Sequence, residues 1–439
     1  MVRRTASRLS DLARGRGEPP PGPFRPGFWR SPIRGPWLTS VFGSVLLVGI
    51  PVVFVTGLLS YAAYNPELGG GNDRTPGKGV LGFYLFGWPT EPVWLYRAVI
   101  GTHVLVGLAL LPLILAKLWS VIPKLFTWPA VRSPAHLLER LSLALLVGGA
   151  VFELVTGILN IQLFYPWGFS FYTAHLYGAW VFIGAFVTHV ALKLPTMVRA
   201  LRARRLRDEL RTGLAETVPE EPDETGLVAA NPSAPTISRR GALGMVGGAS
   251  LLLVGLAGGQ TLGDGLRGTA LLAPRGGSFP GDFPINKTAA SRGVRREDTG
   301  ASWRLEIEGV EGVEGVVSLS RADLLGMRQH TERLPLSCVE GWSTTQTWTG
   351  VRLADLVAMV GAVGPAGVLV SSLQKGGAFS VARLADNQIL DPRSLLALQV
   401  AGEDLSLDHG FPARVIVPAA PGVHCTKWVT GLRILGSGA

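Results

Sequence analysis

The sequence predicts a membrane bundle of four α-helical spans with a fifth anchoring helix, followed by a mixed α/β, β-rich soluble domain. Hydrophobic residues make up 47% of the 439-residue chain and charged residues only 16%, which is more apolar than an ordinary soluble protein. Long uncharged runs stop near Gly263, and short alternating segments punctuated by Gly and Pro follow. The formal charge of +10 is concentrated beside the apolar runs, which argues against nucleic-acid binding.

The four-helix membrane domain is predicted to occupy residues 37–195. Trp37 to Tyr64 carries no charge and exceeds the roughly 20 residues that a bilayer requires. The other uncharged runs lie between Arg97 and Lys117, from near His136, and from Phe169 to Leu192. Residues 1–36 are rich in Arg and Pro without apolar periodicity, so we expect a disordered basic cytoplasmic tail.

Basic residues set the expected orientation in the cell membrane. The connection between the first two spans holds few charges, whereas Arg and Lys crowd the segment after the fourth span. The positive-inside rule therefore places the N-terminus and residues 193–240 in the cytoplasm. Residues 196–237 are expected to be a cytoplasmic linker, flexible where Glu, Pro and Asn accumulate.

Residues 238–263 are the predicted fifth transmembrane helix. The sequence Ser238-Arg239-Arg240 before a short, weakly hydrophobic run resembles a twin-arginine export signal, placed internally. An ordinary positive-inside flank is the alternative. Either interpretation carries the domain at residues 280–439 out of the cytoplasm, so the lipid bilayer and the twin-arginine and Sec export machinery are expected partners.

Four histidines lie in or at the spans, where a titratable side chain is costly and usually functional. His175 and His189 are fourteen residues apart, which returns to nearly the same helix face about 21 Å along the axis. One helix could therefore supply an axial ligand to each of two stacked haems. Matching the depth of the spans pairs His103 with His175 for an outer haem and His136 with His189 for an inner haem.

This arrangement resembles the di-haem cytochrome b subunits of respiratory dehydrogenases and hydrogenases. The resemblance implies two b-type haems and electron exchange with membrane quinone. Position 117 is Lys, so the chain does not have two ligands on each of two helices. Packing histidines are the alternative for all four positions. Glu153, the acidic residue within the third span, either relays protons or bonds to a neighbouring helix.

The two cysteines, Cys338 and Cys425, either form one disulfide or include at least one residue with a chemical role. Around Cys338 the sequence reads Leu-Ser-Cys-Val-Glu-Gly-Trp-Ser. This motif resembles the sulfite oxidase fold family of molybdopterin enzymes, particularly the bacterial branch that includes the periplasmic methionine sulfoxide reductase catalytic subunit. The resemblance implies that Cys338 gives a thiolate to molybdenum, a soft ligand for a metal already held by sulfur.

A second segment, from His409 to Trp428, carries the same resemblance. In that family it surrounds the pterin and its phosphate, for which cations and backbone N–H groups are suitable partners. Cys425 stands where relatives usually have Ser, which implies a phosphate-loop residue instead of a metal ligand. The resemblance thus implies a set of cofactor-binding residues: His409, Gly410, Arg414, His424, Cys425 and Lys427.

One departure from the family bears on the substrate. Animal and plant sulfite oxidases have a Gly-Asn-Arg run after the cysteine, and here the corresponding places hold Glu340, Gly341 and Trp342. The absence of that cation disfavours sulfite and leaves a neutral sulfoxide open. Trp342 is, with Cys338, a catalytic candidate.

We therefore expect an oxidoreductase that reduces a small oxo-substrate at molybdenum with electrons from quinol. The alternatives are a sulfite-type dehydrogenase that feeds electrons to quinone and a non-catalytic haem and pterin electron-transfer or sensor protein.

Overall fold

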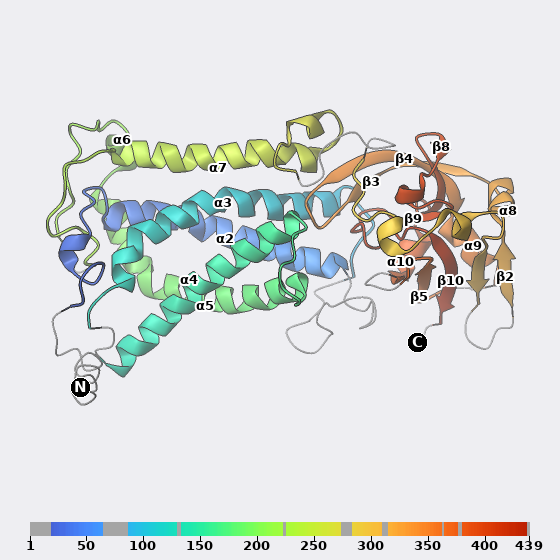
Figure 1. The fold of residues 1–439 in the computed structure, drawn as a ribbon, viewed down its shortest axis with the longest axis horizontal. Helices are drawn as coiled ribbons and strands as arrows, with labels where there is room; N and C mark the ends of the chain where they lie inside the picture. Colours follow the sequence, from blue (N-terminus) through green and yellow to red (C-terminus); the bar gives the residue numbers. More distant parts are fainter. Residues whose placement is uncertain are drawn as a thin grey trace. The chain divides into compact units, whose positions relative to one another are not determined.

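The computed structural model describes residues 19–64, 87–129, 133–222, 225–273, 283–309, 315–361, 364–375 and 380–436. Within this described part, five helices are long and apolar enough to cross a membrane. Each predicted apolar run lies in one of them (Figure 1). They are α2 (Pro36–Tyr64), α3 (Leu95–Leu125), α4 (Pro134–Ile161), α5 (Phe171–Ala203) and α7 (Arg239–Leu262).

Two of these helices extend beyond the uncharged runs. Helix α3 continues past Lys117 to Leu125, and α5 continues past Lys193 to Ala203. Lys and Arg are good helix formers, so a charge ends the membrane-compatible stretch without ending the helix. The shorter helices of this region are η1 (Pro26–Phe28), α6 (Leu206–Glu209) and η3 (Asp264–Thr269).

The chain divides into two compact units, which we describe separately. The first contains Met1–Phe54, Val106–Ile158 and Ala174–Val254, and the second contains Val55–Leu105, Leu159–Thr173 and Gly255–Ala439. The C-terminal end of α2 and the N-terminal part of α3 therefore belong to the same unit as the sheet-rich domain. This grouping matters for the contacts of His103 and Cys338, which both lie in the second unit.

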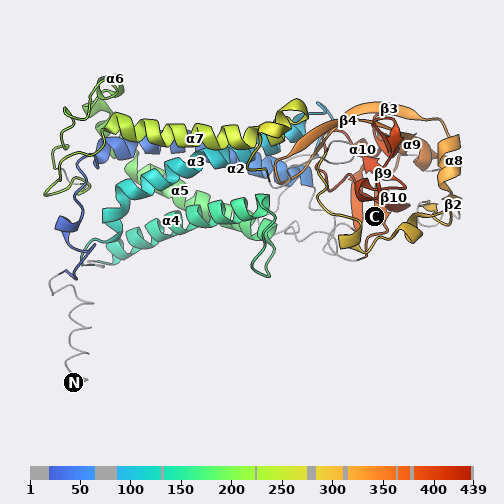
Figure 2. The same cartoon turned by 45° about the horizontal axis from the view of Figure 1, so that its top comes forward.

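Apolar side chains from several helices form the core of the first unit. One cluster joins α2, α3, α4 and α5 through Leu46, Leu110, Ala150 and Phe186. A second cluster packs Ala242 and Val246 of α7 against Trp37, Leu38 and Phe42 of α2. These contacts fix α7 beside α2 within this unit, as the two views in Figure 1 and Figure 2 show.

The predicted N-terminal tail lies partly outside the described residues, because the description begins at residue 19. The described part makes specific contacts. Arg34 is buried, with its guanidinium 5.3 Å from the Trp29 ring centroid and 4.8 Å from that of Trp119. Cation–π contacts of this kind hold a desolvated guanidinium against aromatic faces.

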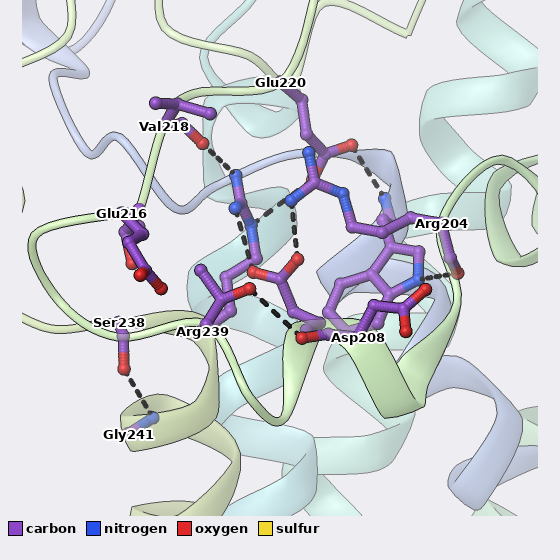
Figure 3. A network of polar contacts seen from close by, with 12 residues as sticks. Arg204, Asp208, Glu216, Val218, Glu220, Ser238, Arg239 and Gly241 are labelled. Atoms are coloured by element: carbon purple, nitrogen blue, oxygen red, sulfur yellow. Dashed lines mark hydrogen bonds and ion pairs between the residues drawn. The ribbon is translucent and has the colours of Figure 1, made fainter.

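Residues of the predicted linker at 196–237 form a buried cluster of ion pairs and hydrogen bonds with the start of α7 (Figure 3). Arg239 is fully buried and donates to Glu209 at 3.1 Å and to the Val218 carbonyl at 2.9 Å. Arg204 donates to the same Glu209 carboxylate at 2.6 Å. Glu220 lies 3.8 Å from the Arg239 Nε atom, and it accepts the Trp37 backbone N–H at the start of α2.

The C-terminal part of the second unit contains two sheets (Figure 1). One has the strand order β2-β1-β10-β5-β6, and the other has the order β3-β4-β7-β8 with β9 paired to β7. The predicted alternating segment forms β1, in which Leu305 and Ile307 are fully buried. The strands are β1 (Leu305–Glu308), β2 (Val316–Leu319), β3 (His330–Ser337), β4 (Ser343–Arg352), β5 (Gly367–Ser372), β6 (Val381–Ala385), β7 (Leu395–Val400), β8 (Glu403–Asp404), β9 (Arg414–Ile416) and β10 (Val429–Leu435).

Two short helices, η5 (Ala290–Arg292) and η6 (Arg296–Thr299), precede β1. The short helices between strands are α8 (Arg321–Gly326), α9 (Leu353–Ala358), α10 (Asp386–Leu390) and η7 (Leu407–His409). A core that includes Leu305, Val351, Leu396 and Leu432 joins residues of both sheets. A second cluster contains Cys338, Trp342 and Cys425, so the two motifs that the sequence singled out share one apolar core.

Candidate functional site

Cys338 directly follows β3 and begins the tight connection to β4. Its N–H donates to the Trp342 carbonyl at 3.0 Å, and its own carbonyl accepts the Gly341 N–H at 3.0 Å. Gly341 has φ +92°, a conformation that residues with a side chain rarely adopt. The Trp342 indole is fixed in turn by a 3.0 Å hydrogen bond to the buried Glu340 carboxylate.

Backbone pairing brings the second motif to this connection. The Gly422 N–H donates to the Ser337 carbonyl at 2.8 Å, and Ser337 forms a β-bridge with Pro421. A small cavity results at this junction. Its lining comes from both motifs and from one preceding segment, and consists of Pro284, Ile285, Asn286, Leu336, Cys338, Trp342, His409, Arg414, Gly422 and Lys427.

Arg414 provides the cavity with a buried positive charge. The residue is 6% exposed, its Nη1 atom donates to the His409 carbonyl at 3.2 Å, and its guanidinium lies 5.7 Å from the Trp348 ring centroid. Within the described part of the chain its Nε atom has no hydrogen-bond partner. Burial lowers the pKa of Arg414 to about 10, while the thiols of Cys425 and Cys338 act in the opposite direction.

His409 and Lys427 also line the cavity. The His409 ring stacks on Phe283 at 3.8 Å between centroids, and burial followed by the charge of Arg414 lowers its pKa to about 4. The Lys427 ammonium donates to the carbonyls of Lys287 and Asp408. Gly410 adopts φ +113°, and a Cβ there would lie 3.1 Å from the Lys427 side chain. Gly410 therefore allows Lys427 to pass close to the backbone.

Two of the predicted cofactor-binding residues, His424 and Cys425, lie outside the lining of this cavity. His424 is fully buried but is not among the lining residues of this cavity. One ring nitrogen is 3.0 Å from the Tyr64 carbonyl at the end of α2, and the other is 3.4 Å from Gln388. Cys425 is also buried and outside the lining set, and burial raises the pKa of its thiol. Their roles as cofactor contacts stay predictions.

The two cysteines are free thiols in the structure, so it contains no disulfide between Cys338 and Cys425.

The sequence reasoning missed the segment from Phe283 to Lys287. Pro284, Ile285 and Asn286 line the cavity, and the carbonyls of Phe283 and Lys287 contact His409 and Lys427. No local pattern marks these residues. The aromatic Phe283 and the polar Asn286, at the start of the predicted domain, were the available indication.

The chemistry of the donor set fits the molybdopterin that the family resemblance implies, whereas the cavity itself, at about 10 Å³, is the size of one water molecule. A thiol, a guanidinium with an unsatisfied buried nitrogen and an ammonium converge on one cavity. A thiolate is a suitable molybdenum ligand, and cations are suitable partners for a pterin phosphate. No carboxylate is among the described residues that line this cavity, and a buried guanidinium is costly unless an anion joins it.

Two of the predicted haem ligands have oriented rings. The Nδ1 atom of His175 lies 2.9 Å from the Thr156 hydroxyl and 3.0 Å from the Glu153 carboxylate, both on α4. In the second unit, the Nδ1 atom of His103 lies 3.3 Å from the Thr56 hydroxyl. A metal-bound histidine usually has such a partner on its other nitrogen. Glu153 of α4 thus contacts the neighbouring helix α5, which is one of the two roles that the sequence left open for it. The other role, proton relay, stays a prediction.

The pairing of these histidines stays a prediction. His103 belongs to the second unit and His175 to the first, and we describe the two units separately. The backbone of His136 lies in the first turn of α4, but its side chain lies outside the described residues. His189 lies on α5 and lines a cavity of the first unit.

That cavity has a volume of about 1080 Å³, at the upper end of the roughly 300–1,000 Å³ usual for ligand pockets. Apolar residues of α2, α3, α4 and α5 line much of it, and a group of cations lines another part: Lys117, Lys124, Arg140, Lys193, Arg199 and Arg204. The cavity therefore combines an apolar volume with His189, several cations and the acidic residues Glu220 and Glu221. Lys117 also donates to the Thr39 carbonyl at 2.7 Å.

Comparison with known proteins identifies the C-terminal domain. Residues 292–437 match the model of the oxidoreductase molybdopterin binding domain. The chain is 30% identical over 132 residues to the uncharacterized oxidoreductase YuiH of Bacillus subtilis, covering 30% of this chain and 64% of that protein.

Two further relatives have named activities. The chain is 31% identical to mitochondrial sulfite oxidase of Rattus norvegicus over 157 residues, covering 29% of this chain and 28% of the enzyme. It is 30% identical to the protein-methionine-sulfoxide reductase catalytic subunit MsrP of Ralstonia nicotianae over 146 residues, covering 30% of this chain and 44% of that subunit. The chain therefore carries, at residues 292–437, an oxidoreductase molybdopterin binding domain similar to parts of these relatives, and it spans less than two thirds of the length of each of the three.

Proposed function

We propose that the chain is a membrane-bound molybdopterin enzyme in which oxygen-atom transfer is coupled through two b haems to the quinone pool. The convergence of Cys338, Arg414 and Lys427 on one cavity carries this proposal. Cys338 lies in one motif and Arg414 and Lys427 lie in the other, and a shared ligand with a metal and an anionic group would account for a thiol and two cations at one cavity.

Four of the lining residues have distinct roles in the proposed site. Cys338 would be the thiolate ligand of molybdenum, and Arg414 and Lys427 would hold the pterin phosphate. His409, neutral at pH 7 because burial lowers its pKa to about 4, would accept or donate a hydrogen bond without adding charge. When bound, the cofactor supplies the oxygen-atom transfer itself.

The reductive direction with a sulfoxide-like substrate is the preferred assignment. A sulfoxide that loses its oxygen consumes two electrons and two protons and yields a thioether and water. Such a substrate is neutral, and the buried Glu340 carboxylate beside Trp342 would repel an anion such as sulfite. The relative MsrP is named as a methionine-sulfoxide reductase subunit, which agrees with this choice.

A sulfite-type dehydrogenase is the second candidate, because one observation favours it. The Arg414 guanidinium faces the same cavity as Cys338, and a buried guanidinium suits an oxyanion as well as a phosphate. Kinetics separate the two candidates. Sulfoxide-dependent oxidation of a reduced dye supports the reductase, and sulfite-dependent reduction of an oxidised dye supports the dehydrogenase.

The membrane half of the proposal uses His103 and His175 for an outer haem and His136 and His189 for an inner haem, with quinol as electron donor. The Glu153–His175 contact and the cavity at His189 support it. We place the protein in the cytoplasmic membrane, with the N-terminus inside and the molybdopterin domain outside.

The decisive experiment compares the two cysteines. Cys338→Ser replaces a soft ligand by a hard one of similar size and should abolish oxygen-atom transfer and alter the molybdenum electron-spin signal. Cys425→Ser, the matched control, introduces the residue usual in relatives and should leave both nearly unchanged. Elemental analysis and a reduced-minus-oxidised spectrum of the unmodified protein should show molybdenum and b-type bands.

Two results would contradict the proposed function. An unchanged molybdenum signal in Cys338→Ser would remove the ligand assignment. Molybdenum and b-type bands without turnover of any oxo-substrate would favour the non-catalytic electron-transfer or sensor alternative.

A further inference from the structure

Within the second unit, two consecutive residues of α3 contact two different neighbours. His103 faces α2, where a Cβ added at Gly57 would lie 3.1 Å from its ring. Val104 is buried and packs against the connection that follows Cys338. A Cβ added at Gly341 would lie 3.0 Å from both Val104 methyl groups. The backbone of Gly341 therefore packs directly against the Val104 side chain.

The conformation of this connection makes the contact possible. Gly341 has φ +92°, and its N–H donates to the Cys338 carbonyl at 3.0 Å. The residue that touches α3 is therefore hydrogen-bonded directly to the cysteine peptide. Opposite Val104, any larger side chain at 341 would both strain the backbone and push the connection away from α3, because it would meet the two Val104 methyl groups.

Thr261, at the end of α7, contacts both the connection that contains Gly341 and helix α3. Its hydroxyl donates to the Gly341 carbonyl at 2.7 Å in a buried hydrogen bond. Its methyl group packs against Gly101, where there is no room for a Cβ. Arg97 of α3 donates to the Thr261 carbonyl at 2.9 Å. Thr261 thus fixes Gly341 relative to the α3 turn that carries His103.

We propose that this contact is the path for electrons between the haem on His103 and molybdenum on Cys338, and that Gly341 and Thr261 are positioning residues for it. The inference rests on the proposed function, which supplies both redox groups. The path runs from His103 through one peptide to Val104, across van der Waals contact to Gly341, and through a hydrogen bond to Cys338. With both groups bound, each transfer would move one electron from a ferrous haem held by His103 to molybdenum held by Cys338, and quinol would replace the electron at the haem.

The physical reason is the steep loss of electron tunnelling with gap width. Covalent and hydrogen bonds carry the electron better than empty space, and the path contains a single through-space step. A change that widens this step should slow transfer without altering either redox centre. Gly341 would then be required because only a residue without a side chain keeps the step at contact distance.

Cross-linking tests the contact without relying on activity. The Gly341 Cβ position lies 3.2 Å from the Val104 Cβ, close to the separation of about 3.5–4.5 Å found in disulfides. Val104→Cys removes the two methyl groups that a side chain at 341 would meet. Combined with Gly341→Cys, it should give a disulfide between these positions in oxidised membranes, detected by mass spectrometry of unreduced peptides. In the control pair, Leu105→Cys replaces Val104→Cys. Its side chain is turned by about 100° around the helix, and the yield should be much lower.

Kinetics test the path. Thr261→Val removes the hydroxyl with little change of size and should slow reoxidation of reduced haem by substrate several-fold. Dye-driven turnover, haem spectrum and molybdenum content should match the unmodified protein. Thr269→Val is the matched control, since the Thr269 hydroxyl bonds only locally to the Leu266 carbonyl.

The outcomes separate the inference from the proposed function. Failure of the 104–341 cross-link, or unchanged haem reoxidation in Thr261→Val, overturns the inference while leaving the enzyme assignment intact. Absence of b-type bands in the unmodified protein overturns the haem assignment and the path with it, and the cross-link still reports whether the contact exists.

Discussion

His424, a fully buried histidine, makes the stability of the protein depend on pH. Burial lowers the pKa of His424 to about 4 from its usual 6.5, because the protonated ring cannot be hydrated inside the domain. The Tyr64 carbonyl, 3.0 Å from the ring, offsets only part of this cost. The ring is therefore neutral at pH 7 and donates to that carbonyl.

The lowered pKa predicts acid sensitivity. Between pH 6.5 and pH 4 the unfolded chain binds a proton at His424 that the folded chain does not, so stability is full above pH 6.5 and falls as the pH drops through this window. The loss should reach on the order of 3 kcal/mol at pH 4. His424→Gln keeps a donor for Tyr64 but cannot titrate, so thermal unfolding in detergent should show a shallower pH dependence. An identical dependence in both proteins would contradict this origin.

At the scale of secondary-structure elements, the start of α7 serves two purposes that the sequence alone could not separate. Arg239 is fully buried in the ion cluster with Glu209 and Glu220, whereas Arg240 is exposed. A guanidinium presents five N–H donors in a planar fork, whereas a Lys ammonium presents three donors from one atom and cannot span the same acceptors. Replacing both arginines together would therefore mix an effect on export with an effect on folding.

Single substitutions resolve the two effects. Arg240→Lys should leave the C-terminal domain in the cytoplasm if the twin-arginine machinery reads this motif, with thermal stability unchanged. Arg239→Lys should in addition lower stability by about 1–3 kcal/mol, since buried charges lose partners. Protease accessibility from outside measures export. Normal accessibility in Arg240→Lys would favour simple positive-inside insertion.

Helix α5 carries the next prediction, because it holds two of the proposed haem ligands. His175→Ala should remove the outer haem and His189→Ala the inner one, each seen as partial loss of the b-type absorbance. His330→Ala, in β3 of the molybdopterin domain, is the control and should retain both. If both α5 variants keep two haems, the histidines serve packing instead.

At the scale of the whole molecule, the proposed function predicts separable half-reactions. Protein made in a haem-deficient host should retain molybdenum and dye-driven turnover, because Cys338, Arg414 and Lys427 line a cavity that contains no proposed haem ligand. Quinol-driven turnover should be lost and should return when haem is added during growth. Quinol-driven activity without haem would show that electrons reach molybdenum by another route.

The sequence determined the helices and the two cofactor motifs, because these depend on local patterns. Uncharged runs of bilayer length, alternation in β1, and the residues around Cys338 and His409 are each contained in one short window. The oxidoreductase assignment of the C-terminal domain followed from those windows and agrees with the comparisons.

Only the tertiary structure decided which distant residues meet. It placed Asn286 at the cysteine cavity, stacked Phe283 on His409, turned His424 toward Tyr64 and buried Arg239 among carboxylates. These contacts join residues far apart in the chain, and their energies depend on burial and partner geometry that no local window contains. The contact of Gly341 with Val104 is of the same kind, since a glycine in a connection indicates a turn, and only packing shows what lies against it.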